Sequence, residues 1–112
     1  FHQAYPAATI LAFSREREQG RTIYEVESQD GATRRDLLYT LTGQTVEIEE
    51  TLPATALPAA VRSALETMAP GATVSRAERV TWDTVVTYEL AIRVGGKARA
   101  LAFDPSGKPV KP

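Results

Sequence analysis

The clearest pattern of apolar and polar positions runs from Thr84 to Val94. Residues of one parity in this segment are apolar or aromatic, namely Val86, Tyr88, Leu90, Ile92 and Val94, whereas polar residues occupy much of the other parity. Because successive side chains of a strand point to opposite faces, the alternation predicts a strand with one buried face.

A different spacing, typical of a helix, occupies residues 55–70. Apolar side chains recur there at i, i+3, i+4 and i+7, in the order Val61, Ala64, Leu65 and Met68. This spacing predicts an amphipathic helix of about three turns. Pro58 suits the first turn, where the missing N–H is not needed, and Pro70-Gly71 ends the helix.

Turn signals divide the rest of the chain into further short segments. After the helix these are 73–82, 84–94, 97–103 and a last strand through Val110; before it they are 9–17, 22–28, 33–39 and 45–50. The turns between them carry glycine, Asp-Gly or aspartate, and such short connections force neighbouring strands to be antiparallel. The sequence therefore predicts two four-stranded meanders.

The two sets of strands match each other at a fixed offset of 64 residues. Between positions 5 and 46, eleven of 42 aligned residues are identical, among them Tyr24/Tyr88, Gly31/Gly95, Leu37/Leu101 and Gly43/Gly107. Similarity at a fixed spacing indicates a duplicated structural unit. We therefore expect a single domain over 1–112, with repeat one at 1–51 and repeat two at 52–112.

The expected fold class is α+β, with two tandem helix-plus-four-stranded antiparallel meander repeats and the helices on one sheet face. The first helix is expected to be truncated, because the offset aligns Phe1 with Leu65 and leaves no counterpart for residues 52–64. A trimmed or processed form of a longer protein would explain this start. The expected core lies beneath the helix that carries Val61, Leu65 and Met68, and consists of Tyr24, Val26, Leu37, Tyr39, Tyr88, Leu90, Leu101 and Phe103.

Charge and composition exclude several classes of protein. The net charge of −1 argues against a general nucleic-acid binder, and no apolar run approaches the roughly 20 residues that span a bilayer. Residues 1–51 carry a charge of −4 and residues 52–112 carry +3, so the molecule is dipolar. The chain has no cysteine, which excludes disulfides and thiolate chemistry. The N-terminus lacks a signal peptide, so an exported form would already have lost it.

Candidate catalytic and metal-binding residues are few. His2 is the only histidine and lies at the N-terminus, so we expect neither a metal site nor a Ser/His/Asp set. Residues 104–107, Asp-Pro-Ser-Gly, are interpreted as a turn rather than a calcium loop. Glu47 and Glu49 alternate with apolar neighbours, which predicts a solvated strand face with no cavity to shift their pKa. The sequence predicts no catalytic residue, no cofactor and no metal.

The order of these segments resembles a known family. LPAAVRSALETMAPGATVSRAERV (57–80), TYELAIRVGGKARALAFDPSGKPV (87–110) and IYEVESQDGATRRDLLYTLTGQTVEIEE (23–50) resemble the PepSY-like repeat of secreted and periplasmic bacterial proteins, which is grouped with the β-lactamase-inhibitor-protein-like fold. The resemblance implies an antiparallel sheet with helices on one face and a free opposite face, and a role in binding or inhibiting proteins such as peptidases. It brings no catalytic residues.

Strand parity assigns residues to the free face. Residues in phase with Tyr24 and Tyr88 should face the helices; the opposite parity comprises Ile23, Glu25, Glu27, Arg34, Asp36, Leu38, Thr87, Glu89, Ala91, Ala98, Ala100 and Ala102. Trp82, at a strand end, is either a core residue or an interface anchor. The candidate partner-binding residues are Trp82, Glu25, Arg34, Asp36, Glu89, Ala98 and Ala100.

Two functions are compatible with these features of the sequence. The first is a non-enzymatic, periplasmic or secreted module that binds a protein or peptide through the free sheet face. The alternative is a structural or envelope-associated domain without a dedicated ligand. Neither involves nucleic acid or insertion into a membrane, and the oligomeric state is not predicted.

Overall fold

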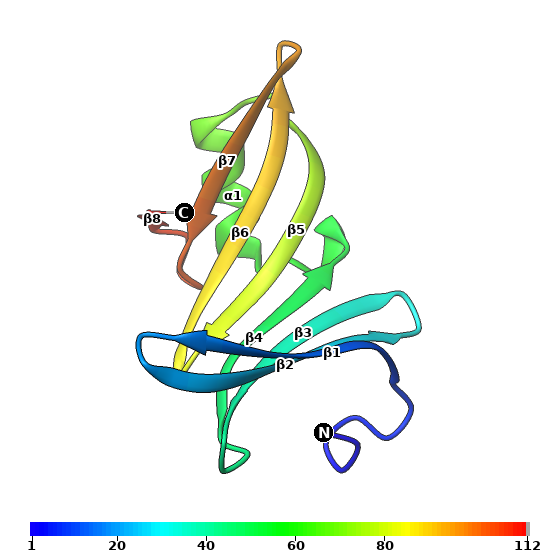
Figure 1. The fold of residues 1–112 in the computed structure, drawn as a ribbon. Helices are drawn as coiled ribbons and strands as arrows, with labels where there is room; N and C mark the ends of the chain where they lie inside the picture. Colours follow the sequence, from blue (N-terminus) through cyan, green and yellow to red (C-terminus); the bar gives the residue numbers. More distant parts are fainter. Residues whose placement is uncertain (112) are drawn as a thin grey trace.

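The computed structural model describes residues 1–111, apart from the side chain of Glu18. It contains one antiparallel sheet in which the order of strands in space follows their order in the chain (Figure 1). The strands are β1 (Thr9–Glu18), β2 (Arg21–Asp30), β3 (Thr33–Thr40), β4 (Thr45–Leu52), β5 (Thr73–Trp82), β6 (Val85–Val94), β7 (Lys97–Phe103) and β8 (Pro109–Val110). A short 3-10 helix, η1 (Ala54–Ala56), and the helix α1 (Ala59–Met68) lie between β4 and β5. Pro112, the last residue of the expected repeat two, lies outside the described residues.

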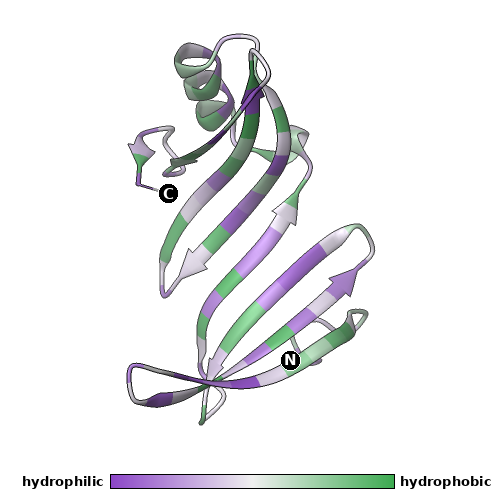
Figure 2. Ribbon diagram, turned by 45° about the horizontal axis from the view of Figure 1, so that its top comes forward, coloured by the Kyte–Doolittle hydropathy of each residue, from purple (hydrophilic) through white to green (hydrophobic). Residues whose placement is uncertain are grey.

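The strands predicted from alternation and turn signals are confirmed. Each of the first seven coincides with an observed strand whose ends differ by two residues or fewer, and Figure 2 shows apolar and polar residues alternating along them. The predicted helix of about three turns is confirmed: α1 has ten residues and begins at Ala59, directly after Pro58. Within residues 1–111, no helix is long and apolar enough to cross a membrane.

The expected arrangement of two helix-plus-meander repeats is wrong. In the described part of the chain α1 is the single α-helix, and residues 1–8 form turns in which the Tyr5 N–H donates to the Phe1 carbonyl at 3.0 Å. All eight strands belong to one sheet, because β4 pairs antiparallel with β5. Alternation within a meander does not specify what pairs with its last strand. Here the chain returns through α1 and adds β5 to the free edge of β4.

The sheet is strongly twisted. In Figure 1, β1 and β2 run across the direction of β6 and β7, and α1 covers β5 to β7 on one face. Register shifts between Ile10 and Ala12 in β1, and between Val74 and Arg76 in β5, mark β-bulges that increase the local twist. The radius of gyration is 15.5 Å, larger than the roughly 13 Å of a compact domain of this length. The molecule is therefore more elongated than a compact domain of this length.

The main apolar core lies between α1 and strands β5 to β7. It consists of Leu57, Val61, Leu65, Ala69, Ala77, Tyr88, Leu90, Ile92 and Phe103. The expectation that Tyr24, Val26, Leu37 and Tyr39 also pack beneath the helix is wrong, and Met68 is 43% exposed. A helix of ten residues is only about 15 Å long, so it covers β5 to β7 and does not reach β2 and β3.

The turn between β7 and β8 packs against the first turn of α1 at Gly107. A Cβ atom at Gly107 would lie 2.5 Å from the carbonyl oxygen of Ala60, and Gly107 has a φ of 87°. Gly43 adopts nearly the same φ, 88°, but nothing lies within 4 Å of such a Cβ atom. Alanine substitutions at the two glycines therefore distinguish the cost of a left-handed backbone, common to both, from the cost of a steric clash, present only at Gly107.

We expect Gly43→Ala to lower the free energy of unfolding by about 1 kcal/mol, the cost of a left-handed backbone for alanine. Gly107→Ala should cost about 1 to 2 kcal/mol more, because the added Cβ meets the backbone of Ala60, which must shift. Urea denaturation of both variants measures the difference. Equal losses would show that the turn does not rest on α1.

Candidate functional site

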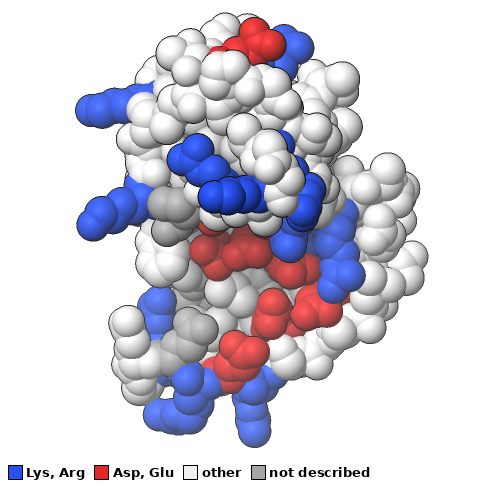
Figure 3. All heavy atoms as spheres, turned by 90° about the horizontal axis from the view of Figure 1, so that it is seen from above, with Lys and Arg blue, Asp and Glu red and all other residues white. Residues whose placement is uncertain are grey.

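The sheet face opposite α1 carries three rows of side chains that run across the strands. Directly paired residues of neighbouring strands share a face, so the register defines each row. The central row is Glu27, Asp36, Glu49, Val80 and Thr87; one neighbouring row is Glu25, Leu38, Glu47, Trp82 and Val85; the other is Arg34, Thr51, Glu78, Glu89 and Ala102. We call the carboxylates of these rows the acidic band: Glu25, Glu27, Asp36, Glu47, Glu49, Glu78 and Glu89. Figure 3 shows acidic side chains gathered in the middle of the molecule, with Lys and Arg around them.

A hollow of about 340 Å³ opens in the middle of the acidic band. It is bordered by Arg34, Asp36, Glu49, Thr51, Arg76 and Glu78. The Arg34 guanidinium donates to Glu27 at 3.0 Å and lies 3.5 Å from Asp36, and Arg76 pairs with Glu78 at 2.9 Å. Both arginines at the rim are therefore paired with carboxylates of the acidic band.

The Thr51 hydroxyl fixes the backbone of β3 beside the hollow. Its Oγ1 accepts the Arg34 N–H at 2.8 Å and donates to the Arg34 carbonyl at 3.3 Å. One side chain thus satisfies both backbone groups of Arg34 and keeps β3 and β4 in register.

Glu49 lies at the centre of the acidic band and is half-buried. Burial raises the pKa of Glu49 to about 7, and the negative charges of Glu47, Glu78, Asp36 and Glu89 add to the effect. Within residues 1–111, no ion pair to Glu49 is found. The expectation that no cavity shifts its pKa is wrong, because its neighbours come from three other strands and alternation along β4 does not reveal them.

The residues predicted to bind a partner lie on this face of the sheet. Glu25, Asp36 and Glu89 are half-buried members of the acidic band, and Arg34 borders the hollow. Ala98 and Ala100 are exposed on β7, and Trp82 is 58% exposed at the end of β5. The interpretation of Trp82 as a core residue is therefore wrong. Ile23 and Ala102 have the expected parity and lie on this face, but both side chains are buried.

Other residues of this face are not among the candidates that the sequence predicts. They are Glu27, Glu47, Glu49, Thr51, Arg76 and Glu78. For Glu47 and Glu49 the alternation along the strand predicts only a solvated face. The sequence pattern does not show that β4 pairs with β5. This pairing places the carboxylates of β2 to β4 beside those of β5 and β6.

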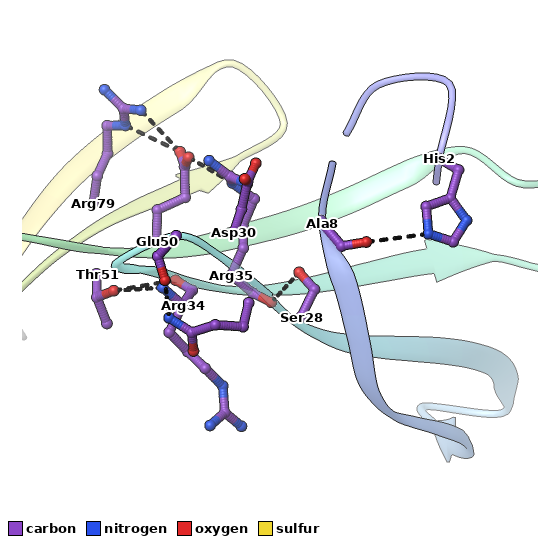
Figure 4. Close-up of polar contacts among 11 residues, drawn as sticks. His2, Ala8, Ser28, Asp30, Arg34, Arg35, Glu50, Thr51 and Arg79 are labelled. Carbon is purple, nitrogen blue, oxygen red and sulfur yellow. Dashed lines mark hydrogen bonds and ion pairs between the residues drawn. The ribbon is translucent and has the colours of Figure 1, made fainter. Parts of the chain in front are cut away.

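The tightest carboxylate group does not make a convincing metal site. Carboxylate oxygens of Glu25, Glu27 and Asp36 lie within 4.8 Å of one another. Because the Arg34 guanidinium already donates to Glu27 and lies close to Asp36, a cation is present there, and we assign no metal ligand. His2 lies at the N-terminal turns, with its Nε2 3.3 Å from the Ala8 carbonyl (Figure 4).

Behind the acidic band, on the helix face, Glu50 joins two arginines. Arg35 donates to it from Nε at 2.9 Å, and Arg79 from Nη2 at 2.9 Å, so the two side chains converge on Glu50 in Figure 4. Burial raises the pKa of Glu50, but the hydrogen bonds from Arg35 and Arg79 outweigh burial and hold the pKa below its ordinary value. Tyr5 places its ring 4.3 Å from the Arg35 guanidinium. This cluster ties β3, β4 and β5 together beneath the hollow.

Comparisons with known proteins identify the fold. No protein-family model matches the chain, and no match is found among curated proteins. A BLIP-like protein from Bacteroides fragilis is 18% identical, with a TM-score of 0.73, over 98% of this chain and 77% of that chain. A DUF2874 family protein from Bacteroides uniformis is 14% identical, with a TM-score of 0.77, over 98% and 80% of the two chains.

A third solved structure carries a description of cellular location. It is a "putative periplasmic" protein from Bacteroides eggerthii, 14% identical with a TM-score of 0.78, again over 98% of this chain and 80% of that chain. At these identities the comparisons establish a BLIP-like fold. The finer assignment to the PepSY-like repeat has no matching family model and stays a prediction.

Proposed function

We propose that this chain is a non-enzymatic, periplasmic or secreted module that binds a protein or peptide through the open face of its sheet. One observation carries the proposal. The acidic band, its hollow and the exposed Trp82 lie together on the sheet face that α1 does not cover. The BLIP-like fold and the "putative periplasmic" neighbour support the proposal.

The open face offers the features of a protein interface. Trp82 and Val85 are exposed at one side of the acidic band, and tryptophan is enriched among residues that dominate binding energy. On the other side, the exposed Ala98 and Ala100 allow a partner to approach the backbone closely. A second, smaller hollow of about 150 Å³ beside Ala100 would receive a protruding side chain.

We expect Ala100→Arg to abolish partner binding while leaving the melting temperature nearly unchanged. The new side chain meets water in the free protein but clashes with a docked surface. The wild type and the variant are used as baits for an envelope extract, and the retained protein is compared by mass spectrometry. The matched control is Ala59→Arg, which places the same side chain at an exposed position of α1, behind the sheet.

Three outcomes of this experiment would count against the proposal. An Ala100→Arg variant that retains the same protein as the wild type would place the interface elsewhere. Equal loss with Ala59→Arg would indicate a general charge effect. A wild type that retains nothing specific would favour the structural domain without a dedicated ligand.

A further inference from the structure

We propose that the partner presents a basic segment to the open face, and that one of its lysine or arginine side chains enters the hollow and pairs with Glu49. This inference rests on the proposed function, because it names the chemistry of the partner that the same face binds. It follows from the distribution of charge around the hollow, from its size and from the position of Glu49 within it.

Glu49 is surrounded by carboxylates from its own strand and from the neighbouring strands of the open face. The charged groups near it are Glu47 from β4, Asp36 and Arg34 from β3, Glu78 and Arg76 from β5, Glu89 from β6, and Glu25 and Glu27 from β2. Carboxylates outnumber guanidinium groups in this set. The field at the centre therefore attracts a cation.

The two arginines at the rim do not reach the central carboxylate. Arg34 is engaged by Glu27 and Asp36, and Arg76 by Glu78. Glu49 has no ion pair within residues 1–111, although it is half-buried among like charges. A cation supplied by a partner would stabilise this carboxylate, because it would relieve both burial and repulsion.

The hollow has the size and lining for one long basic side chain. Its volume of about 340 Å³ exceeds what a single water molecule occupies, and Asp36 and Glu78 flank Glu49 along its border. Lys and Arg carry their charge at the end of a long flexible stem, so the charged end can reach Glu49 while the backbone of the segment stays outside the hollow. Trp82, in the same row as Leu38, is exposed for a second contact with the segment.

Pairing with a cation couples binding to protonation. Because the pKa of free Glu49 is about 7, the group is largely protonated in mildly acidic solution, and a bound cation lowers its pKa. The complex then releases a proton as it forms below pH 7. Affinity for a basic segment should therefore fall as the pH decreases from 8 to about 5.5.

The test uses two capped peptides of equal length, (Lys-Ala)4-Lys and (Glu-Ala)4-Glu, titrated into the isotope-labelled protein and followed by NMR. We expect only the lysine peptide to bind at pH 8, with amide shifts centred on β3, β4 and β5. Glu49→Gln should weaken this binding about tenfold and remove most of its pH dependence. Glu16→Gln, which removes an equal charge from an exposed position on β1, should change the affinity about twofold or less.

Three results would overturn the inference. These are equal binding of both peptides, amide shifts centred on α1, or equal effects of Glu49→Gln and Glu16→Gln on the affinity. The capture experiment separates this failure from failure of the proposed function. If Ala100→Arg abolishes capture but Glu49→Gln retains the same protein as the wild type, the open face is an interface for a partner that is not basic at this point. If neither variant changes capture, the proposed function itself fails.

Discussion

Phe103→Ala is expected to lower the free energy of unfolding by about 3 to 5 kcal/mol. Phe103 is fully buried at the end of β7, paired with Tyr88 of β6, and belongs to the core beneath α1. Removing the ring leaves a cavity that the short helix and the sheet can fill only in part. Urea denaturation followed by circular dichroism measures the loss.

A matched pair of variants keeps this prediction testable even where Phe103→Ala is too unstable to measure. Phe103→Leu keeps most of the volume and should cost about 1.5 kcal/mol or less. Phe13 is 65% exposed and stacks on Tyr24 with ring centroids 5.8 Å apart, so Phe13→Ala should cost at most about 1 kcal/mol. Similar losses for Phe13→Ala and Phe103→Ala would mean that α1 does not shield the core as described.

Removing the charge of Glu49 and removing that of its neighbour Glu50 are expected to change the free energy of unfolding in opposite directions. Glu50→Gln removes the closer of the two ion-pair partners of Arg35, whose side chain is only 13% exposed. It should cost about 3 kcal/mol, the low end for a broken buried pair, because Arg79 is 40% exposed. Glu49→Gln removes a charge that burial and neighbouring carboxylates disfavour. At pH 8 it should stabilise the protein by about 1 kcal/mol, after allowance for solvent screening of a half-buried group.

The pH dependence of these effects distinguishes the two faces of β4. The folded-state pKa of Glu49 is about 7, above its ordinary value of 4.5. The folded protein therefore holds a proton that the unfolded chain has released between these values, and the gain from Glu49→Gln should disappear as the pH falls toward 4.5. Glu50 has a lowered pKa, so its contribution is present above the ordinary value and is lost as the pH falls through the folded-state pKa. Effects of the same sign at pH 8 would contradict the assignment of the two residues to opposite faces.

The strands were predictable from the sequence because their determinants are local. Alternation along β6 and the glycine-containing turns specify strand positions without reference to distant residues. The BLIP-like fold was likewise expected from the order of these segments. The helix over β5 to β7 followed from apolar residues at helical spacing, with Val61 and Leu65 in the core.

What could not be predicted depends on pairings between distant strands. The second neighbour of β4 is set by the path of the chain through α1, and no pattern within β4 encodes it. The environment of Glu49 follows from that pairing, because Glu78 and Glu89 reach it from β5 and β6. The exposure of Trp82 depends on the same pairing, because it places Trp82 opposite Glu47 on the face away from the helix.

The order of the strands has a consequence for how the chain reaches its native state. All strand pairs described in residues 1–111 join sequence neighbours, but most close across a short turn, whereas β4 and β5 meet only after residues 53–72 have been ordered. The entropy lost on closing a loop grows with its length, so this pairing is slower to form than the hairpins on either side. The two meanders can therefore assemble early and separately. We therefore expect the acidic band, which needs strands from both meanders, to be complete only after β4 and β5 have paired.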